Sequence, residues 1–123
     1  MFRRGRRLRT NPVIRELVRE NSLSPSDFIY PVFIVEGENI KREISSLKGN
    51  YHWSVDRLNE LVDELKIAKV KSVILFGIPD HKDCVGSEAY NEDGIVQRAI
   101  RKLKELDEDL YIITDVCMCE YTS

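Results

Sequence analysis

The chain has 123 residues, of which 42% are hydrophobic and 33% are charged, and its formal net charge is -2. This length allows one domain or part of one, and the composition is typical of a folded globular protein rather than of a disordered tail. The near-neutral charge excludes a general affinity for nucleic acid or anionic lipid. No apolar run approaches the roughly 18 residues that a membrane-spanning helix requires.

Residues 1–27 are predicted to form an N-terminal arm, whose first nine residues contain Arg3, Arg4, Arg6, Arg7 and Arg9. A nucleic-acid-binding arm usually interleaves aromatic residues, and only Phe2 is present. A transit peptide is longer, amphipathic and rich in serine. We therefore favour a solvated arm, or one that docks on a partner subunit. Asn11-Pro12 and Ser24-Pro25 are typical of helix starts, because a capping side chain precedes a proline.

Three apolar segments have the length and composition of buried strands. They are predicted near residues 28–35, 72–76 and 110–116. The first contains Pro31, which removes one backbone donor and weakens that prediction. The sequence therefore predicts three strands spread over residues 28–123.

Two amphipathic segments between these strands are predicted to be helices. One begins at Ser54 and the other near Asp93, and each has an apolar stripe at helical spacing. Residues 38–53 are expected to be a loop, with a turn at Gly49-Asn50. The order strand, helix, strand, helix, strand is typical of a parallel sheet with crossover helices, so the predicted fold class is α/β.

The predicted elements do not make a closed architecture. Three strands cannot form a (β/α)8 barrel, which takes about 250 residues. A parallel strand at residues 110–116 needs neighbours and a covering helix, and the chain stops at Ser123. We therefore expect an incomplete fold, and a small open α/β sheet is the alternative.

The segment Asp115-Val116-Cys117-Met118-Cys119-Glu120 holds the strongest chemical signal. Side chains alternate along a strand, so Asp115, Cys117 and Cys119 are expected to point the same way if the extended backbone continues. They follow the carboxyl end of a strand, where barrels and open α/β sheets build their sites. Thiolates favour zinc, which takes three or four ligands. Two ordinary cysteines at a strand end are the alternative interpretation.

Other candidates are expected at the same end of the sheet. Cys84 and His81 follow the second strand and are candidates for a third ligand, although isolated residues of these types usually bind nothing. Phe76 either walls a pocket or belongs to the core. Residues 86–91 form either a mobile substrate loop or a plain connection. His52 is expected in a loop. Three cysteines without a signal peptide argue against a disulfide framework and favour a reducing cytoplasm.

Several motifs, in order along the whole chain, resemble those of the porphobilinogen synthase (delta-aminolevulinic acid dehydratase) family. They are Arg6-Arg7-Leu8-Arg9 with Asn11-Pro12, FIYPVFIVEG at 28–37, ILFGIP at 74–79, GSEAY at 86–90, GIVQRAI at 94–100 and, most specifically, TDVCMCEYTS at 114–123. The resemblance implies that residues 28–123 are the first three βα units of a TIM barrel. It also implies an arm that wraps a neighbouring subunit, commonly in a homooctamer.

The same resemblance implies an activity. Members of this family are hydro-lyases that condense two molecules of 5-aminolevulinate to porphobilinogen with loss of water, a step that supplies haem and other tetrapyrroles. By resemblance, Cys117 and Cys119 are two of three thiolates on a catalytic zinc, Asp115 lines the active site beside the substrate, and Phe76 walls the pocket. Magnesium in the complete enzyme is left open.

The resemblance also leaves parts of the enzyme unaccounted for. The third cysteine, the two Schiff-base lysines and the arginines that hold the substrate carboxylates are expected beyond Ser123, so we expect this chain to be inactive alone. Two other hypotheses stay open. One is a stand-alone protein-interaction module with incidental cysteines, and the other is a small Cys-x-Cys redox protein.

Overall fold

The computed structural model describes residues 5–123, so the predictions for Arg3 and Arg4 lie outside the described residues. The elements are, in chain order, α1 (Pro12–Leu17), β1 (Ile29–Val35), β2 (Lys41–Glu43), β3 (Tyr51–Trp53), α2 (Leu58–Ala68), β4 (Ser72–Ile78), α3 (Ile95–Leu106) and β5 (Tyr111–Thr114). Single 3-10 turns occur at Arg7–Arg9, Pro25–Asp27, Val55–Arg57 and Ser87–Ala89.

The strands form one open sheet in the order β2-β3-β1-β4-β5. Strands β3, β1, β4 and β5 are parallel, and β2 is antiparallel to β3. Strand β1 pairs with β4 along its whole length, from Ile29 opposite Ser72 to Val35 opposite Ile78. The predicted alternation of strands and helices is therefore confirmed, and the sheet is open rather than closed into a barrel.

The prediction of a loop over residues 38–53 is wrong, because β2 and β3 form a short hairpin there. Each strand has three residues, which is too few for an alternating pattern to stand out in the sequence. Tertiary contacts hold the hairpin in place. Trp53 is fully buried, and the Lys41 ammonium lies 4.5 Å from the centre of its ring.

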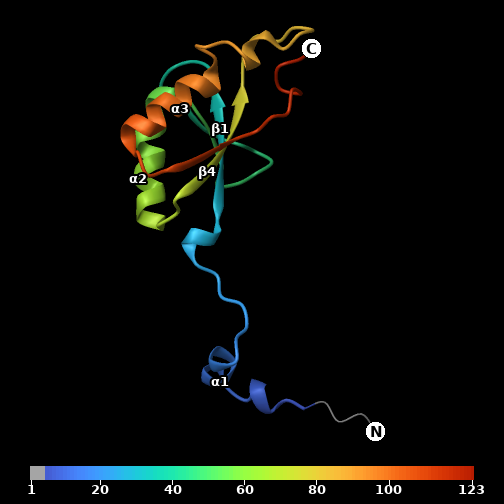
Figure 1. Cartoon of the computed structure of the whole chain (residues 1–123), viewed down its shortest axis with the longest axis vertical. Helices are drawn as coiled ribbons and strands as arrows, with labels where there is room; N and C mark the ends of the chain where they lie inside the picture. The colour runs from blue at the N-terminus through green and yellow to red at the C-terminus, as the bar shows by residue number, and fades with distance from the viewer. Residues whose placement is uncertain (1–4) are drawn as a thin grey trace.

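Helices α2 and α3 cover one face of the sheet, and Figure 1 shows both on the same side. Strand residues that face them alternate along β1 and β4, as Val32, Ile34, Val73 and Leu75 do. The helices contribute the apolar stripes expected from their spacing: Leu58, Leu61, Val62 and Leu65 from α2, and Ile95, Ala99 and Leu103 from α3. This single core holds the carboxyl ends of β1, β4 and β5 at one edge.

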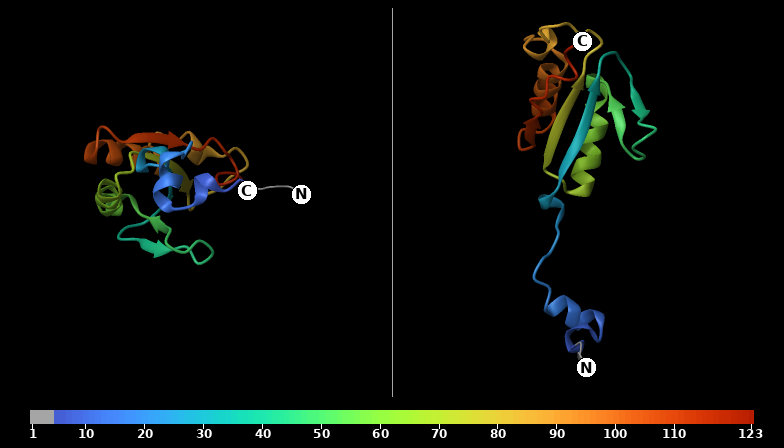
Figure 2. Two further views of the ribbon diagram at one scale, coloured as in Figure 1. Left: turned by 90° about the horizontal axis from the view of Figure 1, so that it is seen from below. Right: turned by 90° about the vertical axis from the view of Figure 1, so that its right-hand side faces the viewer.

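The opposite face of the sheet carries partly exposed aromatic side chains. Phe33 on β1 stacks against Phe76 on β4 with ring centroids 5.3 Å apart. His52 on β3 meets the edge of Phe33, with centroids 6.3 Å apart. His52 therefore lies in a strand and not in a loop as expected. Within residues 5–123, neither α2 nor α3 covers this face (Figure 2).

Residues 5–28 extend away from the sheet, and almost all of them are exposed (Figures 1 and 2). The Asn11 side chain accepts a hydrogen bond of 2.9 Å from the Ile14 N–H, so the predicted start of α1 is confirmed. Ser24 and Asp27 form a capping box around Pro25. Docking of this arm on another subunit stays a prediction. Among residues 5–123, no helix has the length and apolar character to cross a bilayer.

Candidate functional site

The segment 115–120 leaves the sheet at the carboxyl end of β5. The Asp115 N–H donates to the Leu75 carbonyl at 3.3 Å, which extends the β4–β5 pairing by one residue. Beyond this point the backbone is no longer a strand. The predicted strand at 110–116 is therefore shorter than expected, and Asp115 stands just beyond its end, beside β4.

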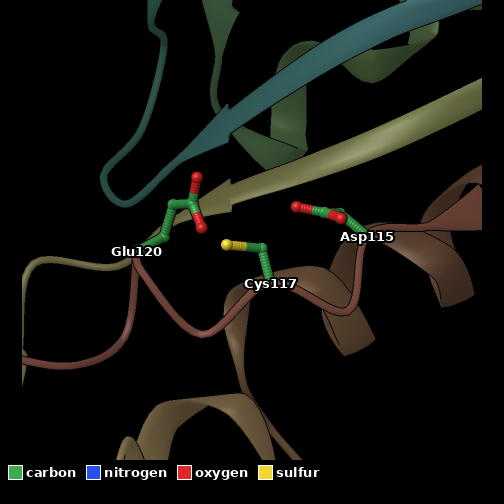
Figure 3. Close-up of side chains that lie close together, drawn as sticks. All are labelled: Asp115, Cys117 and Glu120. Carbon is green, nitrogen blue, oxygen red and sulfur yellow. The ribbon is translucent and has the colours of Figure 1, made fainter.

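Four side chains gather in this segment, and we call Asp115, Cys117, Cys119 and Glu120 the thiol–carboxylate cluster. The ligand atoms of Asp115, Cys117 and Glu120 all lie within 4.8 Å of one another. The sulfur atoms of Cys117 and Cys119 are 3.0 Å apart. Figure 3 shows Asp115, Cys117 and Glu120 projecting from one loop toward a common space. Glu120 is half-buried and the other three residues are exposed.

The cysteines meet through a turn and not through strand alternation. The Cys119 N–H donates to the Cys117 sulfur at 3.4 Å, and the Tyr121 N–H donates to the Met118 carbonyl at 3.0 Å. The expectation that an extended backbone aligns them is therefore wrong. The turn also brings in Glu120, which alternation would have directed away. A carboxylate three residues after Cys117 was the only sequence signal for it.

The cluster shifts the protonation of its own members. The hydrogen bond with the Cys117 thiol, followed by the charge on Cys117, raises the pKa of Cys119. Burial and the nearby charges of Glu120 and Asp115 raise the pKa of Tyr121. Four groups that can carry negative charge thus lie together, so binding of protons or of a cation is favoured.

The loop after β4 is fastened to this segment. The Asp83 N–H donates to the Tyr121 carbonyl at 3.3 Å, and the Ser123 N–H donates to the Asp83 carbonyl at 3.3 Å. The Asp83 carboxylate accepts from the N–H groups of Val85 and Ser87, each at 3.0 Å, and from the Ser87 hydroxyl. These bonds hold the pKa of Asp83 below its usual value, with the Ser87 hydroxyl as the main cause.

The remaining candidates lie outside the cluster. Within residues 5–123, the potential metal-binding group does not include Cys84 or His81. Cys84 is exposed, and the His81 Nε2 atom is 3.8 Å from the Asp83 carboxylate. Phe76 is on the open face of the sheet, stacked on Phe33.

A pocket of about 280 Å³ lies between α3 and the segment that follows β5. Its lining includes Val96, Gln97 and Ile100 of α3, together with Asp115 and Cys117. Pockets for small molecules usually measure roughly 300–1,000 Å³. Because Asp115, Cys117 and Cys119 are exposed, the cluster is an open edge among the described residues rather than an enclosed site.

Comparison with known proteins gives one consistent result. The family model for delta-aminolevulinic acid dehydratase matches residues 2–123. A delta-aminolevulinic acid dehydratase from Ruminiclostridium josui is 56% identical over 123 residues, which is 100% of this chain and 60% of the relative. One from Bacillus subtilis is 48% identical over 121 residues, which is 98% of this chain and 37% of the relative.

A solved structure agrees with these relatives. It is the delta-aminolevulinic acid dehydratase (porphobilinogen synthase) of Toxoplasma gondii in complex with the reaction product porphobilinogen. The TM-score is 0.91 at 36% sequence identity, and the match covers 100% of this chain and 35% of that one. The chain thus spans from about a third to three fifths of the length of the proteins it matches.

Proposed function

Because this chain belongs to the delta-aminolevulinic acid dehydratase family, we propose that it contributes the amino-terminal part of a porphobilinogen synthase. That enzyme condenses two molecules of 5-aminolevulinate to porphobilinogen and releases water. The observation that most supports the proposal is the family match across residues 2–123. In the assembled barrel, β1, β4 and β5 are the first strands of the wall, and their carboxyl ends border the active site.

Asp115 is the proposed active-site carboxylate of this part. It is exposed and held beside Leu75 at the carboxyl edge of the sheet. A carboxylate at this position supplies a counter-charge for the amino group of 5-aminolevulinate. Phe76, whose ring lies on the face that the helices leave open, is the proposed pocket wall.

The imine-forming lysines of the reaction are proposed to lie outside residues 5–123. Such a lysine needs a lowered pKa, which a desolvated pocket provides. Every lysine of this chain is at least partly exposed. The hydrogen bond to Glu64 raises the pKa of Lys41, which is the opposite of what imine formation needs. We therefore expect no activity from the 123-residue chain alone.

Zinc is the proposed cofactor, with Cys117 and Cys119 among its ligands. Thiolates suit zinc, and these two sulfur atoms are already 3.0 Å apart. A tetrahedral zinc with bonds of about 2.3 Å places its sulfurs about 3.8 Å apart, so the exposed side chains need to open only slightly. When bound, zinc supplies a Lewis acid that polarises a carbonyl oxygen.

The arm and the cysteines support two further proposals. Helix α1 has six residues, and Val13 and Leu17 are 65% and 79% exposed. So short a helix is marginal in water without a packing partner. We propose that the arm packs on a neighbouring copy in a homo-oligomer, as in the octamers of the family. We also propose a cytoplasmic location, because Cys84, Cys117 and Cys119 are free thiols that a reducing compartment preserves.

The test is a chimera that joins this chain to the remaining part of the Bacillus subtilis relative, with which it is 48% identical. It is assayed for porphobilinogen formation from 5-aminolevulinate with zinc added. We expect activity from the chimera and none from the chain alone. In the chimera, Asp115→Asn should lower kcat by about 100-fold, while the matched control Asp109→Asn should leave it unchanged.

Two results would count against the proposal. Porphobilinogen formation by the chain alone would mean that one of its own lysines performs the imine chemistry. A chimera that folds, as judged by circular dichroism and gel filtration, but forms no product would reject porphobilinogen synthesis as the function.

A further inference from the structure

We propose that a cavity between the carboxyl ends of α2 and α3 binds a small organic anion with an apolar body, such as a medium-chain carboxylate. Its volume is about 520 Å³, and sites for small molecules usually measure roughly 300–1,000 Å³. The cavity lies where β4 and β5 begin, at the opposite end of these strands from the thiol–carboxylate cluster. The proposal therefore goes beyond porphobilinogen synthesis and does not depend on it.

Backbone hydrogen bonds fix the two turns that frame the cavity. In the turn between α2 and β4, the Val70 N–H donates to the Leu65 carbonyl at 3.0 Å. At the start of β5, the Tyr111 N–H donates to the Lys71 carbonyl at 2.9 Å, which joins the turn before β5 to the turn before β4. The cavity is thus shaped before any ligand binds.

The inner wall of the cavity is apolar. Val62, Leu65 and Leu110 line it and belong at the same time to the buried core. Val70, which is half-buried, is also part of this wall. A ligand that removes apolar surface from water gains binding free energy, so an alkyl group suits this wall.

Some charges around the cavity already have partners. The Lys66 ammonium lies 3.6 Å from the Asp107 carboxylate. The Lys104 ammonium donates to the carbonyls of Glu108 and Leu110 at 2.7 Å and 2.8 Å, so it offsets the negative charge at the carboxyl end of α3. The net charge that a ligand meets is therefore set by the remaining side chains of the lining.

Those remaining charges favour an anion. Lys69 and Lys71 line the cavity, are exposed, and form no ion pair within residues 5–123. Asp109 is the one acid that opposes them in the described part of the lining. Lys69 ends α2 with a φ of 59°, in the left-handed region that favours glycine. A glycine there would leave the cavity without this ammonium group.

Octanoate is the probe, because it joins an alkyl chain to one carboxylate. We expect saturable binding of octanoate to the isotope-labelled 123-residue chain, with chemical-shift changes centred on Leu65, Val70 and Leu110. Octylammonium, which reverses the charge, and acetate, which lacks the alkyl chain, should each bind about tenfold more weakly. Equal affinities for octanoate and octylammonium would overturn the proposal.

Removal of the two free lysines tests the role of charge. Lys69→Gln combined with Lys71→Gln should weaken octanoate binding by about tenfold, because each exposed ion pair contributes at most about fivefold. The matched control Lys48→Gln, which changes an exposed lysine in the loop between β2 and β3, should bind octanoate as the unchanged chain does. Circular dichroism verifies that each variant keeps the fold. An unchanged affinity in the double variant would reject an anion site.

Val70→Phe distinguishes the cavity from the open face of the sheet. The larger ring should fill the cavity and abolish the chemical-shift changes at Leu65 and Leu110, with the fold again verified by circular dichroism. Changes that persist in this variant, or that centre on Phe33 and Phe76 in the unchanged chain, would mean that octanoate binds the open face instead. Either result contradicts the proposal.

Discussion

At the residue scale, His52 shows how burial sets the behaviour of one group. It lies on β3 against the edge of Phe33, and its Nδ1 atom is buried without a hydrogen-bond partner among the described residues. Burial, and then the charge of Arg42 on β2, lowers the pKa of His52 below its ordinary value of 6.5. The folded chain therefore resists protonation of this imidazole.

This lowered pKa predicts a pH dependence of stability. The unfolded chain takes up the His52 proton more readily, so the stability is full above pH 6.5 and is lost as the pH falls below it. We expect the Tm of the chain to fall by about 2–4 °C more than that of His52→Phe between pH 7 and pH 5. Thermal unfolding followed by circular dichroism at both pH values measures the difference. Equal losses in the two proteins would show that His52 is not responsible.

At the element scale, the loop after β4 and the segment after β5 behave as one unit. Asp83 joins them, since its backbone pairs with residues 121–123 and its carboxylate closes the turn at Val85 and Ser87. Ordering of the thiol–carboxylate cluster thus depends on a residue more than 30 positions earlier in the chain.

Replacing the Asp83 carboxylate should make both the loop after β4 and the segment after β5 more mobile. Asp83→Ala removes the acceptor for the Val85 and Ser87 N–H groups, so their hydrogen exchange should quicken by about tenfold. Exchange at Ser123, which bonds to the Asp83 backbone, should quicken as well. Asp80→Ala, in the same loop, is the control and should change none of them. Unchanged exchange at Ser123 would mean that the two segments are held independently.

Gly77 is the second link between these elements. A Cβ there would meet Val96 Cγ2 at 2.5 Å and the Tyr121 hydroxyl at 2.8 Å, so the close packing of β4 requires glycine. Gly77→Ala should lower the free energy of unfolding by about 1–3 kcal/mol, as overpacking of a core does. Gly5→Ala, where nothing lies within 4 Å, is the control. Urea unfolding measures both, and equal stabilities would mean that Val96 and Tyr121 move aside without cost.

At the scale of the whole molecule, the sheet exposes one strand edge and one face that carries apolar side chains. Among residues 5–123, strand β5 pairs only with β4, so its other edge is free in this part of the chain. The face that carries Phe33 and Phe76 has no helix over it within residues 5–123. A free strand edge beside a partly exposed apolar face promotes association between chains.

The isolated chain is therefore expected to self-associate, and a charge on this face should reduce the effect. Ile113 of β5 pairs with Ile74, whose neighbours on β4, Val73 and Leu75, face the helices. Ile113→Lys should shift the chain toward monomer in sedimentation velocity. Ile67→Lys makes the same change at a side chain on α2 that is 83% exposed, and should have little effect. Equal shifts in both variants would indicate a general effect of charge rather than burial of this face.

Sequence patterns predicted those features that depend on neighbours in the chain. The apolar spacings located β1, α2, β4, α3 and β5 to within a few residues, because the period of the side chains reflects which face is buried. Asn11 before Pro12 marked the start of α1 for an equally local reason. The ordered motifs indicated the family that residues 2–123 match.

What the sequence alone determined about this protein is thus its α/β order, its family and the identity of the thiols after β5. Only the tertiary structure decided that residues 41–53 form a hairpin, because Lys41 and Trp53 meet across strands too short to show a period. It alone placed Glu120 beside Cys117, and Asp83 against residues 121–123. These contacts depend on a turn and on pairing between distant segments, and neither leaves a periodic trace in the sequence.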